Sequence, residues 1–98
     1  MTKLTSKQRA ELRRLAHRLK PVVIVGNDGV TDAVVQSVRE AFNTRELLKV
    51  KSLDSASSPI RELADAITAA IGDAHTVQTI GRTAVLYRPD PDEPELLH

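Results

Sequence analysis

Two groups of residues in this 98-residue chain carry the chemistry of a phosphate-binding surface. The first is Gly26-Asn27-Asp28-Gly29, called the glycine loop below. Its two glycines allow the backbone to approach a ligand closely, and its amide N–H groups suit phosphate oxygens. The second group comprises the cations Arg13, Arg14, Lys20, Lys49, Lys51, Arg82 and Arg88. If the elements that carry these cations adjoin, they form one continuous basic surface to which a polyanion can bind.

The glycine loop has a structural interpretation beside the functional one. It is too short for a P-loop, lacks the Gly-Lys-Ser/Thr ending and is not GxGxxG, so a nucleotide site has little support. A tight turn between a strand and a helix explains the same residues. A GxxG loop like that of KH domains, which lies against a nucleic-acid backbone, explains them as well. Asp28 would repel a phosphate lying directly on the loop, which argues against a purely electrostatic grip.

The chain lacks the residue combinations that catalysis and metal binding require. It contains no cysteine, which removes disulfides, thiolate metal sites and cysteine nucleophiles. Its histidines, His17, His75 and His98, have no metal-ligand spacing. The serines of residues 52–58 have no nucleophile-elbow sequence, and the carboxylates offer no defensible acid and base pair. We therefore expect a protein that is not an enzyme and uses no metal, cofactor or small-molecule substrate.

The aromatic content argues against base stacking as the main mode of binding. Phe42 and Tyr87 are the entire aromatic set. Sheet and barrel folds that stack bases, such as the RRM and the OB-fold, use several rings. Contacts to phosphates therefore fit this sequence better than stacking does.

The net charge of +1 conceals an asymmetry along the chain. The first twenty residues contain seven bases and one acid, Glu11. Residues 89–98 contain four acids and no lysine or arginine, so the rest of the chain, with fourteen bases and nine acids, has a net charge of +5. The prolines of this last segment favour an irregular chain. We therefore expect a folded domain over residues 1–89 and a flexible acidic tail over residues 90–98.

No apolar run approaches the roughly 18 residues of a membrane span. This predicts a soluble, cytoplasmic protein without a membrane partner. A basic amphipathic first helix on an anionic membrane is the weakest alternative, because the apolar face of that helix lacks Trp and Phe.

Apolar residues at helical spacing predict three helices. The first has its apolar stripe over residues 12–19 after a Thr5–Gln8 capping box, and the second runs from a Thr31 cap to Phe42. The third begins at a Ser58 cap with Pro59 in the first helical position and stops at Gly72.

Four strands are predicted between and after these helices. Residues 22–25 indicate a short buried strand, and residues 47–53 alternate apolar side chains with Lys49 and Lys51. Residues 54–58 connect the second strand to the third helix. Residues 75–80 and 83–88 form a hairpin around Gly81-Arg82. The order αβαβαββ defines an α/β fold, an α+β two-layer sandwich with three helices on a four-stranded mixed sheet.

Four segments, in order and at matching spacing, resemble the YhbY-type CRM domain, the chloroplast RNA splicing and ribosome maturation module. They are Leu19-Lys20-Pro21 leading to the glycine loop, Leu48-Lys49-Val50-Lys51, Ile80-Gly81-Arg82 and Leu86-Tyr87-Arg88-Pro89. The similarity covers about residues 4–89, and it implies a fold similar to the C-terminal domain of a bacterial translation initiation factor. The family pattern is matched by Lys20, Gly26, Gly29, Lys49, Arg82 and Arg88, whereas Asn27 and Asp28 occupy variable positions and the acidic tail departs from the basic ends of the family.

The resemblance implies RNA binding through the GxxG loop and the adjoining basic surface. Stand-alone bacterial members are associated with precursors of the large ribosomal subunit, which points to ribosomal RNA as the partner, with ribosomal proteins as further partners, and to a role as a ribosome assembly factor. Two alternatives stay open. One is a protein-interaction module that docks on a ribosomal protein, and the other is a general RNA chaperone not tied to ribosomes.

Overall fold

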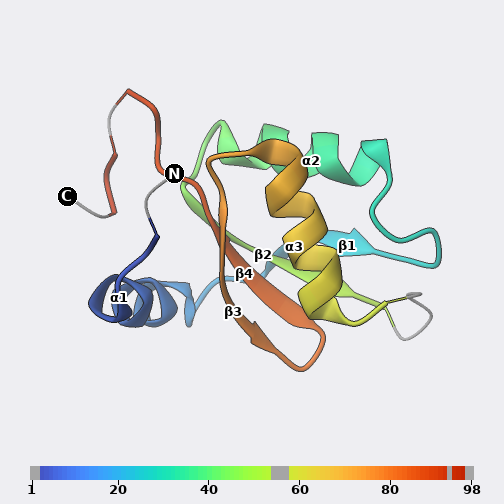
Figure 1. The fold of residues 1–98 in the computed structure, drawn as a ribbon, viewed down its shortest axis with the longest axis horizontal. Helices are drawn as coiled ribbons and strands as arrows, with labels where there is room; N and C mark the ends of the chain where they lie inside the picture. The colour runs from blue at the N-terminus through green and yellow to red at the C-terminus, as the bar shows by residue number, and fades with distance from the viewer. Residues whose placement is uncertain (1–2, 54–57, 93, 97–98) are drawn as a thin grey trace.

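Three helices and four strands follow one another along residues 3–53, 58–92 and 94–96, the parts of the chain that the computed structural model describes (Figure 1). Their order is the αβαβαββ order predicted from the sequence. The elements are α1 (Ser6–Ala16), β1 (Pro21–Val25), α2 (Asp32–Phe42), β2 (Leu47–Ser52), α3 (Ile60–Ile71), β3 (His75–Ile80) and β4 (Thr83–Tyr87).

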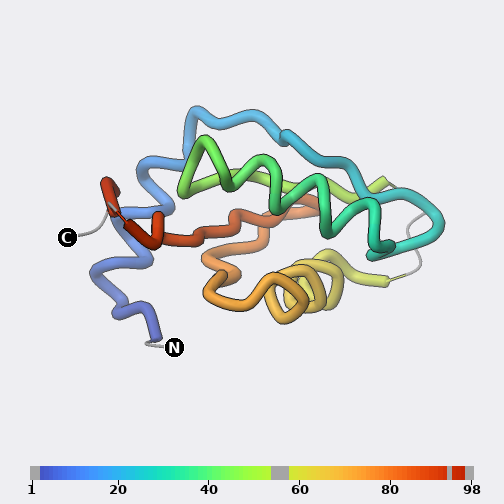
Figure 2. The backbone as a smooth tube through the Cα atoms, turned by 90° about the horizontal axis from the view of Figure 1, so that it is seen from above, coloured from blue at the N-terminus to red at the C-terminus, as the bar shows by residue number. Residues whose placement is uncertain are grey.

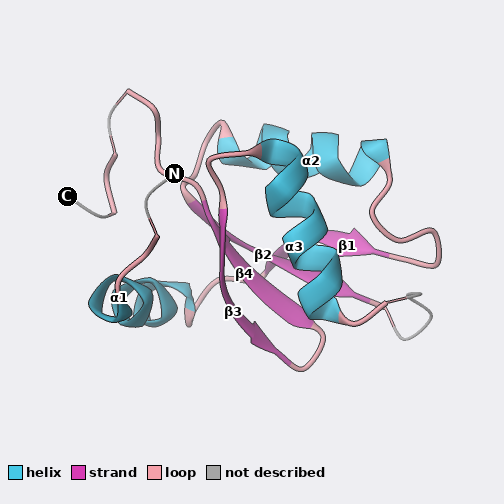
Figure 3. Cartoon of the chain, in the orientation of Figure 1, coloured by secondary structure: helices cyan, strands magenta, loops and turns pink. Residues whose placement is uncertain are grey.

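The four strands form one mixed sheet in the spatial order β1-β2-β4-β3. β1 pairs with β2 in parallel, and the other two pairs are antiparallel, so β1 and β3 are the edge strands. α2 and α3 lie on one face of the sheet and α1 lies on the other (Figure 3). The apolar residues of the helices form a separate cluster with each face. The α/β class, the element order and the mixed sheet are confirmed. The prediction of two layers was wrong, because α1 packs on the face opposite α2 and α3, and periodicity does not show which face of the sheet a helix covers.

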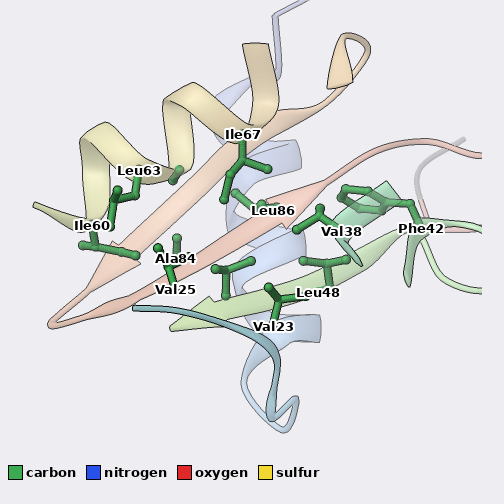
Figure 4. Packing of buried hydrophobic residues seen from close by; sticks show 12 residues of the cluster. Val23, Val25, Val38, Phe42, Leu48, Ile60, Leu63, Ile67, Ala84 and Leu86 are labelled. Carbon is green, nitrogen blue, oxygen red and sulfur yellow. The ribbon is translucent and has the colours of Figure 1, made fainter. Parts of the chain in front are cut away.

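The main core lies between the sheet and the pair α2 and α3 (Figure 4). α2 contributes Val38 and Phe42, and α3 contributes Leu63 and Ile67, each pair one helical turn apart. The strands contribute every second residue, because successive side chains of a strand point to opposite faces. These strand residues are Val23, Val25, Leu48, Val50, Ala84 and Leu86.

α1 covers only part of the opposite face. Its buried Leu12 and Ala16 belong to a second apolar cluster with Leu47, Val77, Val85 and Tyr87 of the sheet. The Arg9 guanidinium donates hydrogen bonds to the carbonyl oxygens of Thr76, at 3.0 Å, and Val77, at 3.2 Å, where the β3–β4 register shifts. These contacts fix α1 over the end of the sheet where β2 and β3 begin and β4 ends.

The part of this face that α1 leaves uncovered includes β1. Val22 is 41% exposed and Ile24 is 58% exposed, so the prediction of a buried strand was wrong for these two residues. Of the five β1 residues, only Val23 and Val25, which face α2 and α3, are buried. The physical reason is that β1 is an edge strand with a helical layer on one side, and its sequence of consecutive apolar residues resembles that of a strand buried on both sides.

Helix ends follow the sequence signals in part. The predicted capping box is confirmed, because the Gln8 amide N–H donates to Thr5 Oγ1 and the Thr5 amide N–H donates to Gln8 Oε1. α1 nevertheless ends at Ala16, before the end of the predicted stripe. α3 begins at Ile60 with Pro59 as its N-cap and no side-chain cap, so the prediction of a Ser58 cap was wrong. Most of the predicted connection before it, residues 54–57, lies outside the described residues.

Glu46, which is 8% exposed just before β2, holds the described part of the acidic segment. Its carboxylate accepts hydrogen bonds from the backbone amides of Asp90 at 2.6 Å, Glu95 at 2.7 Å and Leu96 at 2.9 Å. The Leu96 side chain packs against the apolar cluster under α1. The described part of this segment, red in Figure 2, lies at the opposite end of the long axis from the glycine loop. The flexibility expected of the whole segment stays a prediction.

Replacing Glu46 tests whether its carboxylate holds the described acidic segment in place. In Glu46→Ala the backbone amides of Asp90, Glu95 and Leu96 lose their charged acceptor, so we expect these amides to lose protection from hydrogen exchange. The free energy of unfolding should fall by about 1–2 kcal/mol, because hydrogen bonds to a buried charged group are among the stronger ones. Glu40→Ala removes an exposed carboxylate from α2 and serves as the control. Unchanged protection in Glu46→Ala would contradict the account.

A second prediction concerns pH. Burial, and then the Arg9 guanidinium, lower the pKa of His75, whose ring stacks on Tyr87 with centroids 6.1 Å apart. As the pH falls below about 6.5, the His75 imidazole is therefore protonated in the unfolded chain before it is protonated in the folded protein. The free energy of unfolding falls over this range, until the pH is below the lowered pKa of the folded state. Urea denaturation at pH 7.5 and at pH 5.5 should show this loss. His75→Gln should reduce it, whereas an equal loss in His75→Gln would assign it to other groups.

Candidate nucleic-acid interface

The glycine loop is a closed turn between β1 and α2. The Gly29 amide donates to the Gly26 carbonyl oxygen at 3.1 Å, which leaves Asn27 and Asp28 exposed at the tip of the turn. Thr31 then caps α2, as the sequence predicted, by accepting from the Val34 amide at 3.2 Å. The predicted strand, turn and capped helix are therefore all present around the loop.

The two glycines of the loop differ in what the fold demands of them. Gly29 is buried and has φ +67°, a conformation that residues with a Cβ adopt only at a cost. Gly26 does not have a positive φ, and a Cβ built on it would meet Leu53 Cδ1 at 3.8 Å, an ordinary contact. Neither its backbone conformation nor the space around it therefore requires glycine at position 26.

Cations from two other elements lie near the loop. β1 and β2 run in parallel with Ile24 paired to Lys51 and Val25 to Ser52, so Lys51 is close to the point where the loop begins. The Ser52 amide donates to the Arg82 carbonyl oxygen at 2.8 Å, which brings the β3–β4 turn to the same end of the sheet. Lys49 and Lys51 pair with Val85 and Thr83 of β4 and thus share the face that carries α1.

The arginines of α1 border the same face. A groove with a volume of about 890 Å³ lies between α1 and β3, and Gln78 and Ile80 line it from the sheet. Arg14 is paired with the Glu11 carboxylate, which reduces the charge it offers to a ligand. On the α1 side the groove is lined by Ala10, Arg13, Arg14, Leu15, His17 and Arg18.

Two candidate residues lie apart from this group. Lys20 precedes β1, and a strand of five residues separates it from the loop by about 20 Å at the usual rise per residue. It adjoins Lys49 instead, because Pro21 pairs with Lys49. Arg88 follows β4, where strand alternation places it on the side of Leu86, α2 and α3, and its Nε is buried. The side of the sheet that carries α1, Lys49 and Lys51 therefore does not include Arg88.

Sequence reasoning did not single out the apolar component of this surface. We call the uncovered part of the α1 side of the sheet the open face. Ile80 is 62% exposed there, and Leu53, which is 45% exposed, continues the apolar surface to Gly26. Only the register of the strands shows which residues share this face, so the sequence alone could not group them. The open face consists of Val22, Ile24, Lys49, Lys51, Gln78, Ile80 and Thr83.

Two kinds of feature are absent from the described residues. Histidines and carboxylates there form no cluster that could hold a metal ion. None of the helices in the same residues is long and apolar enough to cross a membrane.

The arrangement defines a class of protein: a small α/β domain whose closed glycine turn stands at the end of a basic, partly apolar sheet face. Such a surface can give backbone amides and cations to a polyanion at the same time.

Comparison with known proteins identifies the family. Residues 4–88 match the model of the CRS1 / YhbY (CRM) domain. A protein of Haemophilus influenzae named RNA-binding protein is 40% identical over 92 residues, which is 94% of this chain and 92% of that one. YqeI of Bacillus subtilis, named a probable RNA-binding protein, is 37% identical, with 95% and 96% of the two chains covered.

A solved structure agrees in fold. The solution structure of SAV1595 from Staphylococcus aureus, which was proposed to bind RNA, superposes with a TM-score of 0.77 at 33% identity. The match covers 97% of this chain and all of that one. The chain thus belongs to the CRS1 / YhbY (CRM) domain family, and the resemblance drawn from its sequence is confirmed.

The contrast between the two glycines gives a prediction about stability. Gly26→Ala should leave the free energy of unfolding unchanged or raise it by up to about 1 kcal/mol, because alanine fits there and reduces the entropy of the unfolded chain. Gly29→Ala should lower it by about 1–2 kcal/mol, because of the positive φ. Urea denaturation of both variants measures the difference. Equal destabilisation by the two substitutions would contradict the geometry described for Gly26.

Proposed function

We propose that this protein binds structured RNA without catalysing a reaction, and that its target is ribosomal RNA in precursors of the large subunit, where it acts as a cytoplasmic assembly factor. The names of its relatives support RNA as the partner. The resemblance of the sequence to stand-alone bacterial CRM proteins supports the ribosomal assignment.

The observation that carries the proposal is the meeting of three segments at one end of the sheet. The glycine loop follows β1, Lys51 lies beside it on β2, and the β3–β4 turn with Arg82 is hydrogen-bonded to Ser52. Cations placed there contact phosphates, while the glycine backbone approaches the sugar-phosphate chain. Glycine at position 26, which the fold does not require, suits such an approach.

The salt dependence of binding is the first test. If about five phosphates are engaged, log K for a fragment of large-subunit ribosomal RNA should fall against log salt with a slope of roughly −3.5 to −4.5. Lys51→Gln should make the slope less steep by about 0.7–0.9, because one phosphate contact is lost. Arg61→Gln, which removes an exposed cation from α3 on the other side of the sheet, is the matched control. A slope near zero for the unaltered protein would refute phosphate binding.

Gly26→Ala tests the loop in the same assay. Because we expect the substitution to leave the fold intact, weaker binding reports on the approach of RNA and not on stability. We expect a loss of about fivefold, the equivalent of about one hydrogen bond. Unchanged affinity in folded Gly26→Ala would remove the loop from the interface.

The ribosomal assignment requires evidence from cells. Crosslinking and sequencing of bound RNA, together with gradient sedimentation, should show enrichment of large-subunit ribosomal RNA and co-migration with precursor particles. Enrichment of messenger RNA without particle association would favour the general RNA chaperone. Particle association that survives RNase treatment would favour docking on a ribosomal protein.

A further inference from the structure

One row of side chains crosses the whole open face. Ile24 of β1 pairs with Lys51 of β2, Lys51 pairs with Thr83 of β4, and Thr83 pairs with Ile80 of β3. Strands lie about 4.8 Å apart, so the row is about 14 Å long. Its two ends are isoleucines that are 58% and 62% exposed, and its centre is an ammonium group and a hydroxyl.

Further exposed aliphatic side chains lie near the Ile24 end of this row. Val22, two residues before Ile24, is 41% exposed on the same face, and Leu53 extends the surface to Gly26. A single exposed isoleucine on an edge strand is ordinary. Exposed aliphatic side chains on both edge strands of one face, with lysines between them, form a surface suited to a ligand with flat apolar faces and negative charge.

The charge around the row identifies the kind of ligand. None of the four strands, over their described bounds, contains an aspartate or a glutamate. The single carboxylate of α1 is that of Glu11, which is paired with Arg14. Arg13 and Arg18 line the groove beside Gln78 and Ile80. A face with cations and no unpaired carboxylate on its elements suits a polyanion better than an average protein surface.

We propose that the open face binds two or three unpaired nucleotides of the RNA, with Ile24 and Ile80 packing against the faces of bases and Lys51 contacting the phosphate between them. This inference rests on the proposed function and adds that the bound part of the RNA is single-stranded. Unpaired bases expose apolar faces that a duplex keeps stacked, and aliphatic side chains also contact bases where they are unstacked. A four-stranded sheet of the RRM type holds the same number of bases, although it does so with aromatic rings.

The test compares paired and unpaired RNA. Fluorescence anisotropy measures the binding of a short unstructured RNA and of the same strand annealed to its complement. The double variant Ile24→Ser/Ile80→Ser keeps the net charge and alters two side chains that are more than half exposed, so the fold should persist. Val35→Ser, a change of the same chemistry at a partly buried residue of α2 across the sheet, is the control and should bind both RNAs like the unaltered protein.

We expect the double variant to lose about tenfold in affinity for the unstructured RNA, with an unchanged salt slope and unchanged affinity for the duplex. Unaltered affinity for both RNAs, or an equal loss on both, would overturn the inference while leaving the proposed function in place. If the double variant keeps its affinity for both RNAs but loses the particle association that survives RNase treatment, the open face binds a protein partner. That result would overturn the inference as well. If the unaltered protein binds the fragment of large-subunit ribosomal RNA but neither short RNA, the inference alone fails. If it does not bind that fragment either, the proposed function itself fails.

Discussion

The parallel pairing of β1 with β2 is the contact on which the candidate interface depends. It aligns the carboxyl ends of two strands, so that the glycine loop after β1 stands beside Lys51 and Leu53. The antiparallel pairing of β2 with β4 then brings the β3–β4 turn to the same end through the Ser52–Arg82 hydrogen bond. Three segments that are distant in sequence thereby meet at one end of the sheet. A shift of register by one residue would turn the Lys49 and Lys51 side chains into the core.

The second constraint is the division of helices between the two faces. α2 and α3 cover one face over the main core, whereas α1 alone covers part of the other. Arg9 and the apolar cluster around Leu12 fix α1 at one end, and Glu46 holds the described acidic segment at that same end. Burial raises the pKa of the Tyr87 phenol there, and the Glu46 carboxylate adds to the shift. α1 and the described acidic segment thus lie at one end of the molecule and the glycine loop lies at the other (Figure 1).

Much of this arrangement could be predicted from the sequence. The element order, the Thr5–Gln8 capping box, the Thr31 cap and the alternation of Lys49 and Lys51 depend on local rules, and the structure confirms them. The exposure of Ile24 could not be predicted, because it depends on which strand lies at the edge and on where α1 packs. The same applies to Arg88, whose side of the sheet follows from strand register. The different demands on Gly26 and Gly29 depend on φ angles and neighbours that the GxxG pattern does not contain.

The most direct test of the central claim is to map the amide resonances of the protein that shift on titration with a fragment of large-subunit ribosomal RNA. The account predicts that the shifts gather on the glycine loop, on residues 49–53 and on the β3–β4 turn, while the solvent-exposed sides of α2 and α3 remain unperturbed. Shifts confined to α2 and α3, or to the segment around Glu46, with none at the glycine loop would contradict it.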